Sequence, residues 1–178
     1  MPTTKANDRV ELVFSLFDAD GNGVLESEDF ELMGERVIAA VPEAGDKEKS
    51  KMLGAFRRYW ETLVRELDAN GDGRISPEEF MAIVLDPQRF DATVDEFADA
   101  LAAMGDPDGD GFVERSHFTA LMTAIGFQRP NIDALFDAFE PVEGDRVPVV
   151  TWADGIRDYY RPEKAGIPGD HLVVGTAR

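Results

Sequence analysis

The chain contains no cysteine and only 2 histidines, and acidic residues outnumber basic ones two to one. Without cysteine, disulfides and thiolate-bound metals are excluded. With 18 Lys plus Arg against 36 Asp plus Glu, the formal net charge at pH 7 is −18. Nucleic acid and anionic membranes repel a surface of this charge, so we expect neither as a partner.

Long apolar runs are missing as well. No segment comes near the roughly 18 consecutive apolar residues that a membrane-spanning helix needs. Residues 1–9 lack the apolar core of a signal peptide. Hydrophobic residues nevertheless make up 43% of the chain, and 12 residues are Phe, which is enough to bury a core. We therefore expect a folded, soluble, cytoplasmic protein that is monomeric.

What the sequence does contain is a repeated unit. Each copy has an apolar segment with helical spacing, an acidic loop with glycine, and a second apolar segment. The pattern is clearest in the segment before the second loop, which carries Met52, Phe56, Tyr59 and Leu63 at helical spacing. The four loops start at Asp18, Asp68, Asp106 and about Glu140. The repeat predicts an all-α protein built from four helix-loop-helix units.

The second loop, Asp68–Glu79, has the complete pattern of a calcium loop of the EF-hand type. Ca²⁺ takes six to eight oxygen ligands, and such a loop supplies them from positions 1, 3, 5, 7, 9 and 12, with glycine at position 6. Gly73 occupies that sixth position. The predicted ligands are Asp68, Asn70, Asp72, the carbonyl of Arg74, and Glu79, with Ser76 as a water-mediated contact.

The first loop differs from this pattern at position 12, where Asp29 replaces glutamate. Aspartate is one methylene shorter, so a smaller, six-coordinate shell becomes favourable and Mg²⁺ can compete with Ca²⁺. The predicted ligands are Asp18, Asp20, Asn22, the carbonyl of Val24, and Asp29, with Glu26 as a water-mediated or compensating contact.

The third loop has the most acidic front half but places His117 at position 12. An imidazole nitrogen is a poor ligand for hard Ca²⁺ and cannot supply two oxygens. Either Glu114 at position 9 compensates or water completes the shell, and we expect weaker binding than in the second loop. The predicted ligands are Asp106, Asp108, Asp110 and the carbonyl of Phe112.

The fourth loop, from Glu140 to Thr151, has lost its ligand set. Val142 stands at position 3 and Pro148 at position 9, so we expect a structural partner for the third loop without metal. Hydrophobic residues recur at position 8 and aromatic residues at position 13 of every loop. The first set predicts antiparallel bridges between paired loops and the second a shared core. They are Leu25, Ile75, Val113 and Val147, and Phe30, Phe80, Phe118 and Trp152.

The predicted fold is therefore all-α. About eight helices form two pairs of EF-hands, packed into one compact globule with short β bridges between loops. Residues 1–86 form the N-terminal pair, 87–161 the C-terminal pair, and 162–178 a tail docked on the core.

The chain resembles the four-EF-hand sarcoplasmic calcium-binding proteins and their bacterial relatives of the calerythrin group. The long spacing between the first two loops, the helix that bears Trp60, and the tail sequence Ile167–Leu172 carry this resemblance. It covers nearly the whole chain. The resemblance implies a compact globule rather than a dumbbell, a C-terminal segment packed on the core, and a role in calcium buffering or signalling inside the cell.

Three functions follow from these observations. A calcium buffer or modest sensor is favoured, because the 6 Met are scattered and do not form the Met-rich groove of a strong sensor. The alternative is a calcium-dependent regulator that binds a helical segment of a partner protein. An enzyme or light-emitting protein is disfavoured, because only His117 and His171 are available and no catalytic arrangement stands apart from the loops.

Overall fold

The computed structural model describes residues 4–18, 20–67, 73–84, 86–161, 163–164 and 166–173. This part of the chain forms eight α-helices, one 3-10 helix and two three-residue strands. The predicted all-α class is confirmed. None of the described helices is both long enough and apolar enough to span a membrane.

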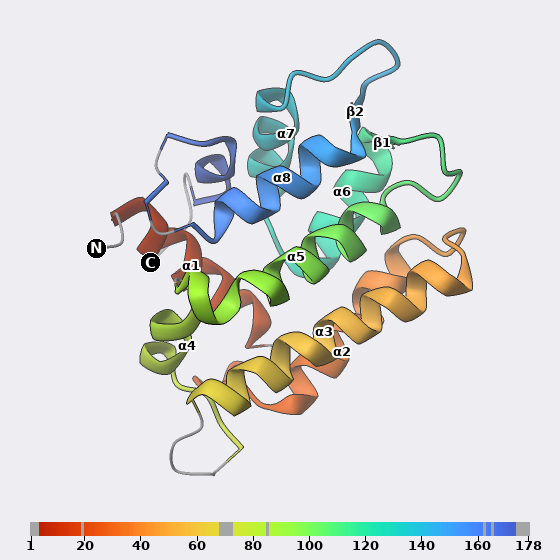
Figure 1. Ribbon diagram of the computed structural model, residues 1–178. Helices are drawn as coiled ribbons and strands as arrows, with labels where there is room; N and C mark the ends of the chain where they lie inside the picture. The colour runs from red at the N-terminus through yellow and green to blue at the C-terminus, as the bar shows by residue number, and fades with distance from the viewer. Residues whose placement is uncertain are drawn as a thin grey trace.

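The helices follow the predicted repeat, two to each loop (Figure 1). The elements are α1 (Thr4–Phe17), α2 (Ser27–Ala40), α3 (Asp46–Leu67), α4 (Pro77–Val84), α5 (Pro87–Met104), β1 (Phe112–Glu114), α6 (Arg115–Ile125), α7 (Arg129–Ala138), β2 (Arg146–Pro148), α8 (Val149–Tyr159) and the 3-10 helix η1 (Pro168–Val173). Thus α1 and α2 flank the first loop, α3 and α4 the second, α5 and α6 the third, and α7 and α8 the fourth.

Local signals fix several helix ends where the sequence predicts them. At the start of α4 the amide of Glu79 donates to Ser76 Oγ at 3.1 Å, and the amide of Ser76 donates to Glu79 Oε1 at 2.9 Å. This reciprocal pair is a capping box, with Pro77 at the first helical position. At the end of α6, Gly126 adopts a left-handed φ of 119° and its amide donates to the carbonyl of Met122.

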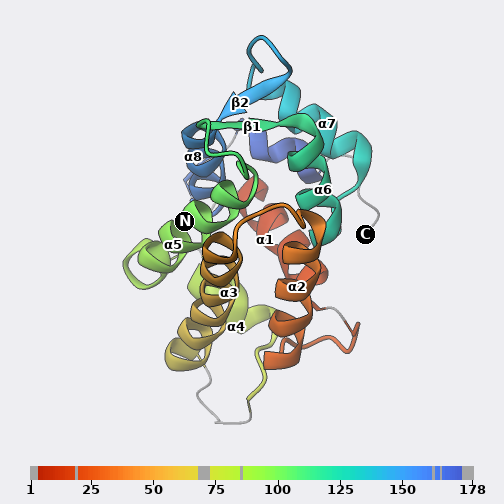
Figure 2. The same cartoon turned by 90° about the vertical axis from the view of Figure 1, so that its right-hand side faces the viewer.

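Both predicted bridges between loops are present. Leu25 pairs with Ile75, each amide donating to the other's carbonyl at 2.9 Å. In the C-terminal pair, β1 and β2 are antiparallel with Val113 opposite Val147. Figure 2 shows these two strands side by side at one end of the molecule. Paired loops therefore share backbone hydrogen bonds.

The two pairs of hands share one core. Helix α3 lies between α2 and α5, and α5 in turn lies beside α8 (Figure 1). The ring of Tyr59 on α3 lies 5.4 Å from that of Phe17, 4.9 Å from that of Phe90 and 5.6 Å from that of Phe97. The four aromatic residues at position 13 are all buried. These contacts join the first, second and third units into the single globule that the sequence predicts.

The tail returns to the first helix. Helix η1 packs against α1, α7 and α8, and Leu172 is 3% exposed. Arg9 of α1 is fully buried and holds this segment through its guanidinium. Its Nη1 lies 2.7 Å from Asp170 Oδ1, its Nε donates to the carbonyl of Tyr159 at 2.7 Å, and its Nη2 donates to that of Arg161 at 2.9 Å.

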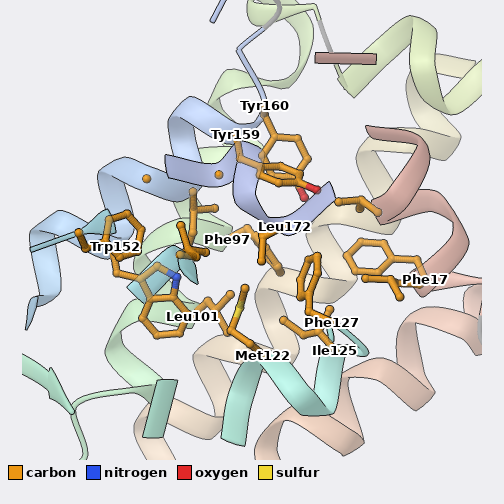
Figure 3. Close-up of a pocket in the computed structure, with 17 residues that line it drawn as sticks. Phe17, Phe97, Leu101, Met122, Ile125, Phe127, Trp152, Tyr159, Tyr160 and Leu172 are labelled. Atoms are coloured by element: carbon orange, nitrogen blue, oxygen red, sulfur yellow. The ribbon is translucent and has the colours of Figure 1, made fainter. Parts of the chain in front are cut away.

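A small cavity lies in the core between the tail and the helices of the first, third and fourth units (Figure 3). Phe97, Leu101, Met122, Trp152 and Leu172 contribute to its apolar lining, and its volume is about 60 Å³. An apolar cavity that binds benzene measures about 150 Å³. The space is therefore too small for an aromatic chromophore or substrate.

Candidate metal centres

The first loop brings three of its predicted ligands together. Asp18, Asp20 and Asp29 each place a carboxylate oxygen within 4.8 Å of the other two. The loop's own amides orient two of them. The amide of Asn22 donates to Asp18 Oδ1 at 3.2 Å and to Asp20 Oδ1 at 3.1 Å, and the amide of Gly23 donates to Asp18 Oδ2 at 2.8 Å. The loop's own hydrogen bonds thus hold the carboxylates of Asp18 and Asp20 close together.

Asp29 reaches this cluster despite its short side chain. It is only 1% exposed, and its Oδ2 accepts the amide of Glu26 at 2.9 Å. The same hydrogen bond joins positions 9 and 12 of the second loop, between Ser76 and Glu79. Asn22 is also fixed, because its Oδ1 accepts the amide of Val24 and its Nδ2 donates to Glu26 Oε1 at 2.7 Å.

The third loop repeats the hydrogen bonds that the amides at positions 5, 6 and 7 donate in the first loop. The amides at positions 5 and 6, Asp110 and Gly111, donate to Asp106 at 3.0 and 2.9 Å, and the amide of Phe112 donates to Asp110 Oδ1 at 2.9 Å. Asp106, Asp108 and Asp110 form a second carboxylate group within 4.8 Å. The two loops therefore share one backbone geometry for cation binding.

The surroundings of the third loop shift the pKa of two of its carboxyl groups in opposite directions. Burial raises the pKa of Asp106, and the hydrogen bond between the two side chains lowers the pKa of Asp108. Like charges this close favour sharing of a proton. A divalent cation relieves the same repulsion, and carboxylate oxygens are the ligands that Ca²⁺ and Mg²⁺ prefer.

His117, at position 12 of the third loop, lies away from that group. Its Nε2 is 2.7 Å from Glu43 Oε1, in the connector between α2 and α3. The hydrogen bond to the backbone of Glu43 and, second, the bond to His117 lower the pKa of the Glu43 carboxyl. Glu114, at position 9, is exposed at the end of β1. Its compensating role stays a prediction.

Most of the second loop's ligands, Asp68, Asn70 and Asp72, lie outside the described residues. The second half of the loop is described, and Ser76 and Glu79 form the capping box of α4. Arg74 Nε lies 3.8 Å from Glu26 Oε2 of the first loop. This ion pair joins the two loops beside their backbone bridge.

A family model of the EF-hand domain pair matches residues 7–85 of the chain. Calerythrin of Saccharopolyspora erythraea is 25% identical over 167 residues, which are 90% of this chain and 94% of calerythrin. Residues 7–85 match the EF-hand domain pair, and nearly the whole chain is similar to calerythrin.

Solved structures share the fold of this calerythrin-like protein. A calcium-binding protein of Streptomyces coelicolor matches with a TM-score of 0.72 at 25% identity, covering 89% of this chain and 99% of its own. The sarcoplasmic calcium-binding protein of amphioxus matches with a TM-score of 0.69 at 18% identity, covering 99% and 100%. The predicted resemblance is confirmed.

The fourth loop of the calerythrin-like chain is organised by arginines that the loop pattern does not predict. Arg115, the first residue of α6, lies 2.8 Å from Asp145 Oδ2 and 2.5 Å from Asp137 Oδ1. Arg146 Nη1 lies 3.3 Å from Asp110 Oδ2 of the third loop. In the sequence, these arginine contacts are indicated only by acidic residues that remain around a loop without its ligand set.

Proposed function

We propose that this protein binds Ca²⁺ through two to three EF-hand loops and acts as an intracellular calcium buffer or modest sensor, not as an enzyme. The observation that carries the proposal is the convergence of Asp18, Asp20 and Asp29 within 4.8 Å, on a loop whose amides hold two of them in place. The matching group in the third loop and the likeness to calerythrin support it.

The proposed ligands are those that the loop positions predict. In the first loop they are Asp18, Asp20, Asn22, the Val24 carbonyl and Asp29; in the second, Asp68, Asn70, Asp72, the Arg74 carbonyl and Glu79; in the third, Asp106, Asp108, Asp110 and the Phe112 carbonyl. Glu26, Ser76 and Glu114 are proposed as water-mediated or compensating contacts. The fourth loop binds no metal in this proposal.

The first loop is also proposed to accept Mg²⁺. Mg²⁺ demands a compact octahedral shell at about 2.0–2.1 Å, whereas Ca²⁺ tolerates larger and less regular ones. A loop closed by the short side chain of Asp29 offers fewer oxygens at position 12 than one closed by bidentate glutamate. The second loop, closed by Glu79, is expected to favour Ca²⁺.

The placement of methionine favours a buffer over a strong sensor. A sensor exposes a Met-rich groove when it binds calcium. Here Met33, Met52, Met104 and Met122 are all buried. The exposed large hydrophobic residues in the described part of the chain lie in different segments, namely Leu32 in α2, Val142 between α7 and β2, and Val150 in α8. In the described part of the chain these exposed side chains therefore do not gather into one Met-rich groove.

Isothermal titration with Ca²⁺, repeated in millimolar Mg²⁺, tests the proposal. We expect two or three ions per chain, with the first loop's share reduced by Mg²⁺. Glu79→Gln removes the second site and Asp29→Ala the first. Glu78→Gln is the matched control, because Glu78 is the exposed neighbour at position 11. Binding that is unchanged by Glu79→Gln and Asp29→Ala would contradict the proposed sites.

A second candidate function is a calcium-dependent regulator that binds a helical segment of a partner protein. It is favoured by the likeness to the Streptomyces coelicolor protein, whose structure is described as a basis for prokaryotic calcium-mediated regulation. A steep calcium-dependent rise in the fluorescence of a dye that binds apolar surface, with calcium-dependent binding of an amphipathic peptide, would support it. An unchanged dye signal supports the buffer.

A further inference from the structure

A positive side chain of the third loop pairs with acidic residues in and beside the fourth loop. Arg115 follows directly after β1, at position 10 of the third loop. Its guanidinium forms a two-point contact with Asp145, from Nε to Oδ2 at 2.8 Å and from Nη2 to Oδ1 at 3.1 Å. The same guanidinium reaches Asp137 at 2.5 Å and Asp133 at 3.5 Å, both on α7.

Several further contacts hold this arrangement in place. The backbone amide of Arg115 donates to the carbonyl of Asp145 at 3.1 Å. The guanidinium lies 4.5 Å from the centre of the Phe136 ring, a cation–π contact. The Arg115 hydrogen bond lowers the pKa of Asp145. Two-point binding of a carboxylate fixes direction as well as distance, because the guanidinium is planar and rigid.

Asp145 has a backbone conformation that such a contact can stabilise. It stands at position 6 of the fourth loop and has a φ of 57°, a left-handed conformation that costs free energy for a residue with a side chain. The turn continues into β2, where the amide of Val142 donates to the carbonyl of Arg146 at 2.8 Å. Next to it the amide of Val149 donates to the carbonyl of Gly111, in the third loop, at 3.0 Å.

We propose that Arg115 serves the fourth loop as an internal cation in place of a metal ion, and through the shared strands positions the third loop for calcium. It is a positioning residue and not a ligand. The part that concerns calcium rests on the proposed function of the third loop. The part that concerns the fourth loop stands without it.

The sign of the effect separates positioning from simple electrostatics. Removal of a positive charge near a cation site, on electrostatic grounds alone, tightens calcium binding. Loss of a positioning residue weakens it. We expect Arg115→Gln to raise the Ca²⁺ concentration needed to half-saturate the third loop by about tenfold, within the range of coupling between residues of one network.

Arg157 is the matched control. Its side chain is 25% exposed, as is that of Arg115, and it also pairs with three aspartates, Asp95, Asp99 and Asp154. These lie on α5 and α8, away from the strands between the loops. Arg157→Gln therefore removes a comparable network without touching the third or fourth loop. Asp145→Asn removes the other end of the Arg115 contact while keeping a residue that tolerates the left-handed conformation.

The experiment has two arms, both by nuclear magnetic resonance on the full chain. In EDTA, amide hydrogen exchange of Val142 and Val149 reports the fourth loop and its junction with the third. In a Ca²⁺ titration, the amide of Gly111, which donates to Asp106, reports the third loop, and that of Gly23 reports the first.

The proposal predicts faster exchange and a higher Gly111 midpoint in Arg115→Gln and Asp145→Asn, with the Gly23 midpoint unchanged, and neither change in Arg157→Gln. Unchanged exchange, a lowered Gly111 midpoint, or an equal effect of Arg157→Gln would overturn it. If Gly111 of the unmodified protein does not respond to Ca²⁺, the proposed third site fails, and the exchange arm alone decides the role of Arg115.

Discussion

At the scale of single residues, arginines form ion pairs with the carboxylates of the acidic loops and of the tail. Arg115 contacts the acidic residues of the fourth loop, and Arg146 contacts Asp110 of the third. Arg9 holds the tail from within the core. In a chain with a net charge of −18, these three arginines lie where carboxylates or backbone carbonyls meet.

Arg146 is expected to compete with calcium in the third loop, in contrast to Arg115. Its guanidinium lies 3.3 Å from Asp110 Oδ2, 4.2 Å from the centre of the Phe112 ring, and the side chain is partly exposed. Exposed ion pairs contribute about 0.2–1 kcal/mol. We therefore expect Arg146→Gln to lower the Ca²⁺ midpoint of the Gly111 amide by about two- to fivefold. Arg146→Lys keeps the charge and should change it little; weaker binding in Arg146→Gln would contradict this role.

Replacement of Arg9 by Met is expected to destabilise the fold strongly. The substitution leaves Asp170 without its cation and the carbonyls of Tyr159 and Arg161 without a donor. Removal of one partner from a buried pair costs about 3–5 kcal/mol. Urea unfolding of the full chain measures the change. Asp170→Asn, which keeps the shape of the side chain, should lower the free energy of unfolding less than Arg9→Met. A decrease below about 1 kcal/mol for Arg9→Met would show that the contacts of Arg9 with the tail contribute little.

At the scale of elements, the sequence predicts most of what the structure shows. The capping box at Ser76, the glycine stop at Gly126 and the bridges at position 8 all depend on neighbours in sequence or on fixed positions in a twelve-residue loop. Such local rules can be read from one chain. The family resemblance and the convergence of the aspartates in the first and third loops also follow from spacing.

Other features of the site depend on packing between distant segments, which spacing does not encode. The contact of His117 with Glu43 spans 74 positions, and that of Arg115 with Asp145 spans 30. The poor ligand at position 12 is visible in the sequence, but its partner is not. For the same reason the role of Arg9 in holding the tail is not predicted, although a docked tail is.

Two helical glycines are expected to respond oppositely to alanine. A Cβ added at Gly54 in α3 meets no atom within 4 Å, whereas one at Gly155 in α8 lies 2.8 Å from the ring of Phe139. Alanine favours a helix by about 0.8–1.0 kcal/mol over glycine. Gly54→Ala should raise the free energy of unfolding by up to about that amount, and Gly155→Ala should lower it. Thermal unfolding of both variants checks this; a stabilised Gly155→Ala would refute the close contact.

At the scale of the whole molecule, one hydrophobic core supports four loops that differ in their sets of predicted metal ligands. Aromatic contacts of Tyr59 join the first three units, and its contact with Tyr160 reaches the end of α8 in the fourth. The tail packs against α1, α7 and α8. The net charge of −18 opposes this compact state. Divalent ions in two or three loops would relieve part of that repulsion, and each independent site adds about 2.7 kcal/mol at a hundredfold excess over its dissociation constant.

The alkaline limit of stability is set by buried tyrosines. All 3 tyrosines of the chain, Tyr59, Tyr159 and Tyr160, are buried, and burial is the main cause that raises the pKa of each. The folded protein keeps protons that the unfolded chain releases near pH 10. The contribution of these tyrosines to the free energy of unfolding is therefore fully present below about pH 10, and it is lost as the pH rises further.

A spectrophotometric titration tests this expectation. Tyrosinate absorbance should remain absent until the protein unfolds, and it should then appear for all three side chains in one step. Tyrosinate that forms near pH 10 while the circular dichroism remains native would contradict the burial of these rings.

The most direct test of the central claim is a calcium titration of protein labelled with ¹⁵N in glycine. Gly23, Gly73 and Gly111 each stand at position 6 of one acidic loop. Calcium in the first and second loops predicts saturable shifts of the Gly23 and Gly73 amides, with Gly111 responding at higher concentration. If none of the three amides moves, the protein does not bind calcium through these loops.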